Sequence, residues 1–240
     1  PHALGPLNGV ARIVVEDGFP TMPDATEAVY CMWDRAAVRG ANRFVAATWS
    51  TRLTFFQIAN GARRIYIFSG AFGLTPTGTY TDDTWELTCT RFFGAGAGNA
   101  DRLRVWKTEK DVPCSGCEVA LTYSGTIPAL VPTGPGRDWA FGGTGTANSF
   151  SGLLDEAYWW ESSNGGCVPT PAQIETFMDG TSITVAAFAD ACAPKTRVPM
   201  NNSPNDQIAV GSGGYDPTNV TLYGSPTYTA AGASGAADLP

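Results

Sequence analysis

The sequence predicts an all-β fold, an antiparallel β-sandwich that carries one short helix near residues 171–179. Two observations support this prediction. Short apolar runs recur along the chain between breaks rich in turn residues, with 28 glycines and 17 prolines among 240 residues, a pattern typical of strands rather than helices. In several runs, apolar and polar residues alternate with the period of a strand, most clearly over residues 101–107.

The runs that we expect to form strands are spread over nearly the whole chain. They are residues 11–15, 28–33, 43–49, 53–59, 63–68, 85–93, 101–107, 118–124, 139–143, 152–160 and 219–224. Over residues 101–107, Leu103 and Val105 fall on one side and Trp106 falls on the other, which predicts a sheet with one buried face. The last run has no partner close to it in sequence, so we expect it to pair with an N-terminal strand such as 11–15.

One helix is predicted by its capping residues. Thr170 is a good N-cap, Pro171 occupies the first helical position, and Gln173 completes a capping box three residues after the cap. Gly180 ends the helix, and its apolar stripe consists of Ile174, Phe177 and Met178. Because the helix is short, its stability must come from docking onto a sheet.

Length and composition predict a single domain with an N-terminal extension. We expect residues 1–24 to form an extended arm, because they are rich in Pro, Gly and Ala and poor in large apolar groups. Residues 25–240 are long enough for one β-sandwich, with 195–240 returning to the same sandwich. The terminal segments can bury little surface alone. We therefore expect contact with other protein subunits, as a homo-oligomer or within a larger assembly.

Charge and hydropathy exclude two classes of partner. Lys and Arg number 15 against 22 Asp and Glu, a net charge of −7, and no basic cluster occurs, so we expect no nucleic-acid binding. No apolar stretch approaches the roughly 20 residues that span a bilayer, so we expect no membrane insertion. The first ten residues lack the basic start and apolar centre of a signal peptide. We therefore expect no export through a signal peptide of this chain.

The cysteines leave two alternatives open. Cys114-Ser-Gly-Cys117 has the spacing of half a zinc site, which would need a second pair of ligands at matching spacing. The remaining cysteines are scattered singly, and the only histidine is His2. We prefer a disulfide within the tight loop, or reduced thiols, to a zinc site. The sequence does not decide between these two states.

A carboxylate-rich stretch, residues 149–164, raises the question of a glycosidase. Retaining glucanases on β-jelly rolls carry Glu-x-Asp-x-x-Glu on one strand, which places the nucleophile and the acid about 5 Å apart. Here Leu153 stands two residues before Asp155, and Tyr158 stands three residues after it. With a single histidine, a Ser/His/Asp or Cys/His arrangement is also absent from the body of the chain. We expect no catalytic residues and no enzyme activity.

The order of motifs over roughly residues 80–182 resembles the laminin G-like, concanavalin A-like family of sandwiches. Its most specific parts are Phe150-Ser-Gly152 through Glu156 and the capped helix. Two departures stand out: Glu86 replaces the histidine that usually follows the strand-opening Trp, and residues 106–117 replace a short turn. The resemblance implies a jelly-roll, concanavalin A-like sandwich. It also implies that a set of residues is a structural signature rather than an active site: Gly152, Asp155, Glu156, Thr170 and Gln173.

Two places could bind a ligand. Trp106 lies between Arg102 and Arg104 on the polar side of its strand, and an exposed ring there would stack on a sugar. Asp82 and Asp83 precede a strand and could hold calcium, the only cofactor that we consider. For Trp106 we prefer the alternative that a helix or a neighbouring chain covers it. For the two aspartates we prefer a solvated turn.

Three functions follow from these observations. We favour a non-enzymatic structural or binding protein on the exterior of an assembly, such as a virion decoration, capsid-stabilising or tail protein with capacity for glycan adhesion. Tailed-phage proteins with laminin G-like domains provide the analogy. The second is a secreted or cell-surface lectin-like module, which would need a signal peptide upstream of residue 1. The third and least favoured is a glycosidase with an unrecognised carboxylate pair.

Overall fold

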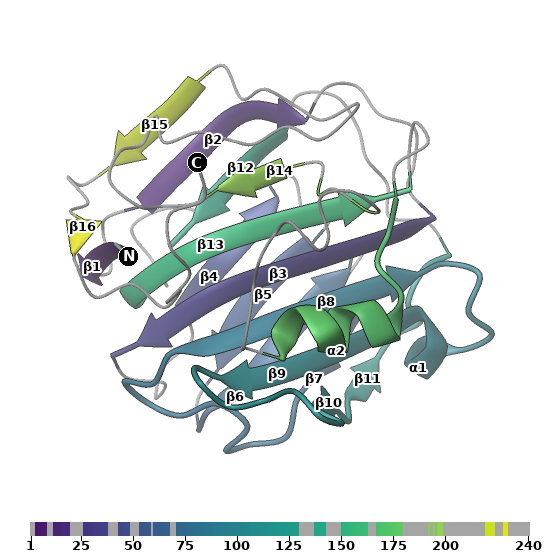
Figure 1. Ribbon diagram of the computed structural model, residues 1–240. Coiled ribbons are helices and arrows are strands. Elements are labelled where there is room, and N and C mark those ends of the chain that lie inside the picture. Colours follow the sequence, from purple (N-terminus) through teal and green to yellow (C-terminus); the bar gives the residue numbers. More distant parts are fainter. Residues whose placement is uncertain are drawn as a thin grey trace.

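The computed structural model is an antiparallel β-sandwich, which confirms the predicted fold class (Figure 1). The residues that it describes are 3–8, 12–19, 26–37, 43–48, 53–58, 60–67, 71–129, 137–142, 150–162, 167–179, 192, 194, 196–198, 219–223 and 228–229. Every run that the sequence analysis assigns to a strand contains one.

Sheet A forms one layer of the sandwich, and its strands pair antiparallel. In spatial order the strands are β10 (Glu118–Val119), β9 (Leu103–Glu109), β8 (Glu86–Phe93), β3 (Glu27–Ala36), β13 (Ser151–Glu161), β1 (Ala3–Asn8) and β16 (Tyr228–Thr229). A further short strand, β14 (Thr196–Val198), also pairs with β13.

Sheet B forms the other layer, again with antiparallel pairs. Its order is β11 (Thr122–Ser124), β7 (Ala71–Leu74), β6 (Ala62–Ile67), β5 (Leu53–Ile58), β4 (Arg43–Thr48), β12 (Arg137–Phe141), β2 (Arg12–Phe19) and β15 (Asn219–Tyr223). The chain crosses between the sheets several times, so each sheet combines strands that are distant in sequence.

The N-terminal segment is part of the sandwich. Residues 3–8 pair with β13 in sheet A, and residues 12–19 pair with β12 in sheet B, which corrects the expectation of an extended arm over 1–24. β15 pairs with β2, from Asn219 opposite Glu16 to Tyr223 opposite Arg12. This is the pairing that the strand pattern predicts. Residues 230–240, on which the predicted contact with another chain also rests, lie outside the described residues.

The inner core fills the space between the two sheets. Strand alternation directs Leu103 and Val105 inward from sheet A and Ile65 and Phe141 inward from sheet B, and all four are fully buried. The remaining members are Ala28, Tyr30, Met32, Ala36, Val45, Ala71, Phe92, Ile127, Phe150, Leu154, Ala157 and Trp159. The sandwich is therefore held by a continuous apolar layer that both sheets supply.

A second apolar layer, which we call the outer core, lies on the other side of sheet A beneath α2 (Pro171–Met178). Figure 1 shows α2 in front of sheet A, across β8 and β9, with strands β4 to β7 of sheet B behind. The predicted capping box is present, since the Thr170 hydroxyl accepts from the Gln173 N–H and the Gln173 carboxamide oxygen accepts from the Thr170 N–H. The buried face of the helix consists of Ile174, Phe177 and Met178. No helix among the described residues is long and apolar enough to cross a membrane.

The expected signature residues of β13 have a structural role. Gly152 has φ +149°, and a Cβ there would lie 2.2 Å from the Arg35 carbonyl oxygen, so only glycine fits. Glu156 is the extra residue of a β-bulge and has φ +41°. Asp155 and Glu156 are both buried within sheet A. The carboxylates of this stretch thus belong to a strand, as the sequence analysis concludes.

All six cysteines form disulfides. Cys31–Cys89 joins the neighbouring strands β3 and β8, and Cys114–Cys117 closes the tight loop after β9. The third pair, Cys167–Cys192, ties the segment before α2 to a residue beyond it. Every pair has at least one cysteine in the outer core. The disulfides therefore hold one side of sheet A, and Cys114 and Cys117 are not zinc ligands in this form.

Candidate functional site

The first expected site, around Trp106, lies under α2. The Trp106 ring is 0% exposed, and its Nε1 donates a hydrogen bond to Glu175 Oε1 on α2 at 3.2 Å. The Arg104 guanidinium lies 5.0 Å from the ring centroid. A fully covered indole has no face for a sugar, so Trp106 is not available as a stacking ring. It is the covered alternative that the structure shows.

The two arginines beside Trp106 already have partners. Arg104 Nε donates to Glu118 Oε1 at 2.7 Å, and its Nη2 binds the other oxygen of the same carboxylate. This bidentate pairing raises the pKa of Arg104 above its usual value. Arg102 donates from Nε to the Gly96 carbonyl at 2.8 Å and from Nη1 to the Ile127 carbonyl at 2.7 Å. The structure does not bring the three residues together as an open site.

The expected calcium ligands lie in an exposed turn. Asp83 forms an ion pair with Arg35, with 2.9 Å between Arg35 Nε and Asp83 Oδ1, and has φ +54°. Asp82 is also exposed, and its carbonyl accepts from the Thr84 hydroxyl. Among the residues that the structure describes, no group of three or more His, Cys, Asp or Glu side chains could hold a metal ion. The turn supplies at most two carboxylates, one of which has a cationic partner.

A buried ion pair braces the two sheets against each other. Arg63 on β6 of sheet B reaches Asp34 on β3 of sheet A, with 2.6 Å between Nη2 and Oδ1. Its Nη1 donates to the Thr88 hydroxyl at 2.8 Å, and its guanidinium lies 4.1 Å from the Tyr80 ring centroid. Burial acts to lower the pKa of Arg63, but Asp34, together with Tyr80 and Glu86, raises it overall. The pair therefore links the two sheets as a structural contact.

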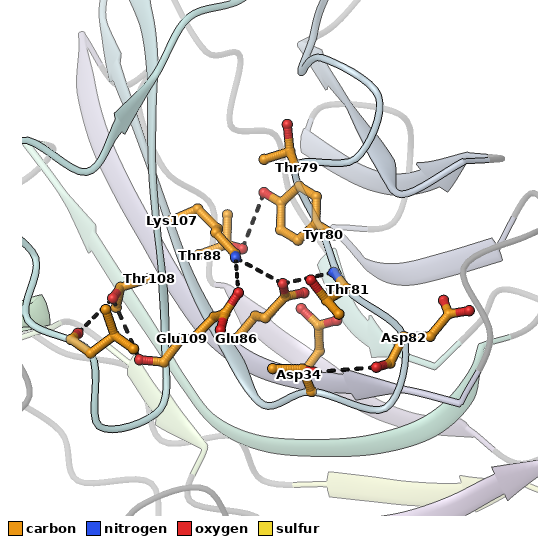
Figure 2. A network of polar contacts seen from close by, with 12 residues as sticks. Asp34, Thr79, Tyr80, Thr81, Asp82, Glu86, Thr88, Lys107, Thr108 and Glu109 are labelled. Atoms are coloured by element: carbon orange, nitrogen blue, oxygen red, sulfur yellow. Dashed lines mark hydrogen bonds and ion pairs between the residues drawn. The ribbon is translucent and has the colours of Figure 1, made fainter.

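A second cation, Lys107, continues this network along sheet A (Figure 2). Its Nζ lies 2.9 Å from Oε1 of Glu86 and 2.9 Å from Oε1 of Glu109. Glu86 is fully buried and also accepts from the Thr81 N–H at 2.9 Å. Burial acts to lower the pKa of Lys107, but the two carboxylates raise it overall. Glu86 and Glu109 are both held in ion pairs with Lys107. Carboxylates in such pairs suit a structural role rather than general acid–base catalysis.

A candidate site that the sequence analysis did not identify lies on the outer face of sheet B. Strand alternation sends Ile65 into the inner core, and Arg64 and Tyr66 to the opposite side of β6. The register places Phe72 of β7 directly opposite Tyr66. Arg64, Tyr66 and Phe72 are only partly buried, and the two rings belong to neither core. We call these three residues the aromatic patch.

The aromatic patch is held together by contacts among its own members. The Tyr66 and Phe72 rings lie 5.3 Å apart and are tilted by 59°. The Arg64 guanidinium lies 4.5 Å from the Phe72 centroid and 5.5 Å from that of Tyr66, and its Nη1 donates to the Tyr66 hydroxyl at 2.7 Å. The patch thus combines two partly exposed rings with a cation that its own tyrosine orients.

Exposed hydroxyl groups lie beside the aromatic patch. Thr122 and Ser124 of the edge strand β11 pair with Leu74 and Phe72 of β7, so they lie on the same face as the rings. Both are exposed. Partly exposed rings surrounded by a few polar groups are typical of surfaces that bind polar ligands such as sugars.

Part of the aromatic patch can be recognised in the sequence, although the sequence analysis did not single it out. Arg64 and Tyr66 alternate with buried residues in the run 63–68, and this alternation places both on the same face. Phe72 stands in a segment that reads as turn-rich, and its role depends on β7, which the sequence analysis did not predict. Predicting that the Tyr66 and Phe72 rings lie side by side therefore requires the register between β6 and β7. Of these two strands, the sequence analysis predicted only β6.

Comparisons with known proteins concern the fold. No protein-family model and no curated protein sequence matches the chain. A protein from Bacteroides ovatus, proposed to bind carbohydrate, aligns with a TM-score of 0.59 and 12% identity over 94% of this chain and 61% of that chain. A heptameric SAP-like pentraxin from Limulus polyphemus aligns with a TM-score of 0.49 and 11% identity, over 92% of this chain and 93% of that one.

A third solved structure, the full extracellular region of zebrafish Gpr126/Adgrg6, aligns with a TM-score of 0.48 and 11% identity over 90% of this chain and 27% of that chain. The alignment with the Bacteroides ovatus protein, of which this chain spans 61%, shows a shared fold. The chain is therefore similar in fold to this protein.

Proposed function

We propose that this protein is a non-enzymatic carbohydrate-binding β-sandwich that holds its glycan at the aromatic patch on sheet B. The observation that carries the proposal is the pair of partly exposed rings, Tyr66 and Phe72, with Arg64 beside them on the outer face of a sheet. Rings of this kind stack on the apolar faces of sugars, while guanidinium and hydroxyl groups bind sugar hydroxyls. The similarity in fold to the proposed carbohydrate-binding protein supports the same function.

The positions of the acidic groups support a binding protein rather than a glycosidase. A retaining glycosidase needs two carboxyl groups about 5 Å apart at an open site. Asp155 and Glu156 are buried inside sheet A, and Asp34 and Glu86 are buried in ion pairs with cations. These carboxylates are committed to the fold. A hydrolase would have to use acids other than these.

The disulfides support a function outside the cytoplasm. All six cysteines are paired, and disulfides persist in oxidising compartments. This supports the secreted or surface-displayed form of the hypothesis. Display on the exterior of a larger assembly, a virion included, stays a prediction that would add a location to the same binding function.

Binding to a glycan panel tests the proposal. Purified protein is measured against immobilised polysaccharides, together with Tyr66→Ala and Phe72→Ala variants. Each variant should weaken binding roughly tenfold, because each removes one ring from the stacking surface. Val112→Ala is the matched control, since Val112 is an exposed apolar side chain, 47% exposed, outside the patch. Full binding by both ring variants, or no binding by the intact protein, would overturn the proposal.

A further inference from the structure

Arg64 differs from the other arginines whose side chains the structure describes. Four of those arginines pair with a carboxylate: Arg35 with Asp83, Arg63 with Asp34, Arg91 with Glu27 and Arg104 with Glu118. Arg102 donates to two backbone carbonyls instead. Arg64 contacts the rings of Tyr66 and Phe72 and the Tyr66 hydroxyl, and it has no carboxylate partner among the described residues.

That no described carboxylate pairs with Arg64 is notable in an acidic chain. Asp and Glu outnumber Lys and Arg by 22 to 15, so a fixed cation would ordinarily find an acidic neighbour. The Tyr66 hydroxyl and the rings of Tyr66 and Phe72 orient the guanidinium without supplying an opposite charge. The aromatic patch therefore presents a positive charge at the place where a ligand would lie.

The atoms of Arg64 also define which edge of the guanidinium a ligand can use. Nε is buried and makes no hydrogen bond, so the edge that includes Nε is closed. Nη1 gives one of its two N–H groups to Tyr66, and Nη2 makes no hydrogen bond to any residue that the structure describes. The edge between Nη1 and Nη2 is the one left for an anion.

We infer that the aromatic patch selects sugars that carry a carboxylate, with a uronic acid residue bound at Tyr66, Phe72 and Arg64. This inference rests on the proposed glycan-binding function and names its ligand class. A planar carboxylate matches the paired donors at the end of a guanidinium. A uronate carries its carboxylate directly on the sugar ring. A sugar ring against the patch therefore brings this group near a guanidinium that lies 4.5 to 5.5 Å from the ring centroids.

Matched pairs of polysaccharides test the inference. Polygalacturonate, alginate and a glucuronan are compared with their methyl-esterified forms, which keep the sugar backbone and lose the charge. At least one uronate should bind, and its ester should bind roughly tenfold to a hundredfold more weakly, the value of a hydrogen bond to a charged group. Binding of that uronate should weaken as salt increases. Equal binding of acid and ester would overturn the inference.

Variants of Arg64 assign the effect to one side chain. Arg64→Gln should bring binding of the uronate down to that of its ester, and Arg64→Lys should restore only part, since lysine keeps the charge without the planar fork. Arg104→Gln is the matched control, a partly exposed arginine beside an aromatic ring on the other sheet, and it should leave binding unchanged. Melting temperatures of all three confirm that each variant is folded.

The outcomes separate this inference from the proposed function. Neutral glycans that bind through Tyr66 and Phe72, with no effect of Arg64→Gln, would leave the glycan-binding function standing and overturn the selection for acids. Binding lost with Arg104→Gln but kept with Arg64→Gln would place the site on sheet A and overturn both. Stronger binding to dextran sulfate than to every uronate would show recognition of charge rather than of a carboxylate, which also overturns the inference.

Discussion

The outer faces of the two sheets carry the same short pattern with different outcomes. Arg104-Val-Trp106 on β9 and Arg64-Ile-Tyr66 on β6 both place a guanidinium next to an aromatic ring on the outer side of a strand. On sheet A, α2 covers the tryptophan and Glu118 neutralises the arginine. On sheet B, the ring stays partly exposed and the arginine has no described carboxylate partner. A local pattern therefore becomes structure or surface according to what packs on it.

The outer core on sheet A contains both large aromatic side chains and disulfides. Four tryptophans lie in the outer core, and every disulfide contributes to it. The tryptophans are Trp33, Trp85, Trp106 and Trp160. Sheet B contains no cysteine at all. The outer face of sheet A thus combines tryptophans with disulfides, whereas the outer face of sheet B has no disulfide.

The largest contrast should come from deleting the two matched rings. Trp106→Ala should lower the free energy of unfolding by about 3–5 kcal/mol, because it empties a large buried site beneath α2. Tyr66→Ala should lower it by about 1 kcal/mol, since its ring is already partly exposed. Denaturant unfolding of both variants measures the difference. Equal losses would mean that the face of sheet B is as covered as that of sheet A.

The second contrast compares the stabilising effects of the disulfides Cys167–Cys192 and Cys114–Cys117. Replacing both Cys167 and Cys192 by Ala should lower the free energy of unfolding by about 2–4 kcal/mol, because the bridge closes a loop with a sequence separation of 25. Replacing Cys114 and Cys117, with a separation of 3, should cost less. Glycan binding by either folded double variant should be unchanged. A loss of binding would show that the two faces are coupled.

The dependence of stability on alkaline pH tests the buried polar network that includes Tyr80 and Lys107. Burial raises the pKa of Tyr80 above 10.0, more than the nearby Arg63 and Thr88 lower it. Lys107 also has a pKa raised above its usual 10.5. Both groups hold their protons to a higher pH in the folded chain than in the unfolded chain. Their stabilisation is complete below the unfolded values and is lost as pH rises through the folded ones.

The free energy of unfolding should therefore fall between about pH 9 and about pH 12. Denaturant titrations across this range measure the decrease. Lys107→Met serves as a control that removes one of the two groups, and its stability should depend less steeply on pH. A flat profile for the intact protein would contradict the bracing role of the network in Figure 2.

The smallest effect is expected from the two arginines on the outer faces. Arg104→Gln should change the free energy of unfolding by no more than about 1 kcal/mol, because its ion pair with Glu118 is partly exposed, at 31% and 37% for the two side chains. Arg64→Gln should have an effect of similar size. Thermal melts of both variants measure it. A large loss for Arg64→Gln would show that this arginine serves the fold instead of a ligand.

The sequence predicted most of the framework because framework signals are local. The alternation in 101–107 placed Leu103 and Val105 in the core, and the capping residues Thr170 and Gln173 defined α2. The strands that were missed are short or contain glycine or proline, such as β1 and β7. These short strands are stabilised by pairing with strands that are distant in sequence. Strand propensity, which depends on local residues, does not reveal such pairing.

The candidate site was harder to predict because exposure is a property of the tertiary structure. Trp106 has the flanking arginines of a surface ring, but Glu175, which caps its indole, lies 69 residues away in sequence. Nothing between residues 101 and 107 reveals that cover. The partners of Tyr66 depend on the register between β6 and β7. Both outcomes required knowledge of which elements pack together.

One consequence of the β6 register concerns how this chain can change over evolution. Arg63 and Arg64 are consecutive, yet one points inward to Asp34 and the other outward to the aromatic patch. Inserting or deleting a single residue in β6 would turn the side chains beyond it to the opposite faces, so that Ile65 would leave the inner core and Tyr66 would point into it. Length variation is thus barred from this strand. Substitution at Arg64 or Tyr66 changes the outer face alone, whereas substitution at Arg63 removes the ion pair between the sheets.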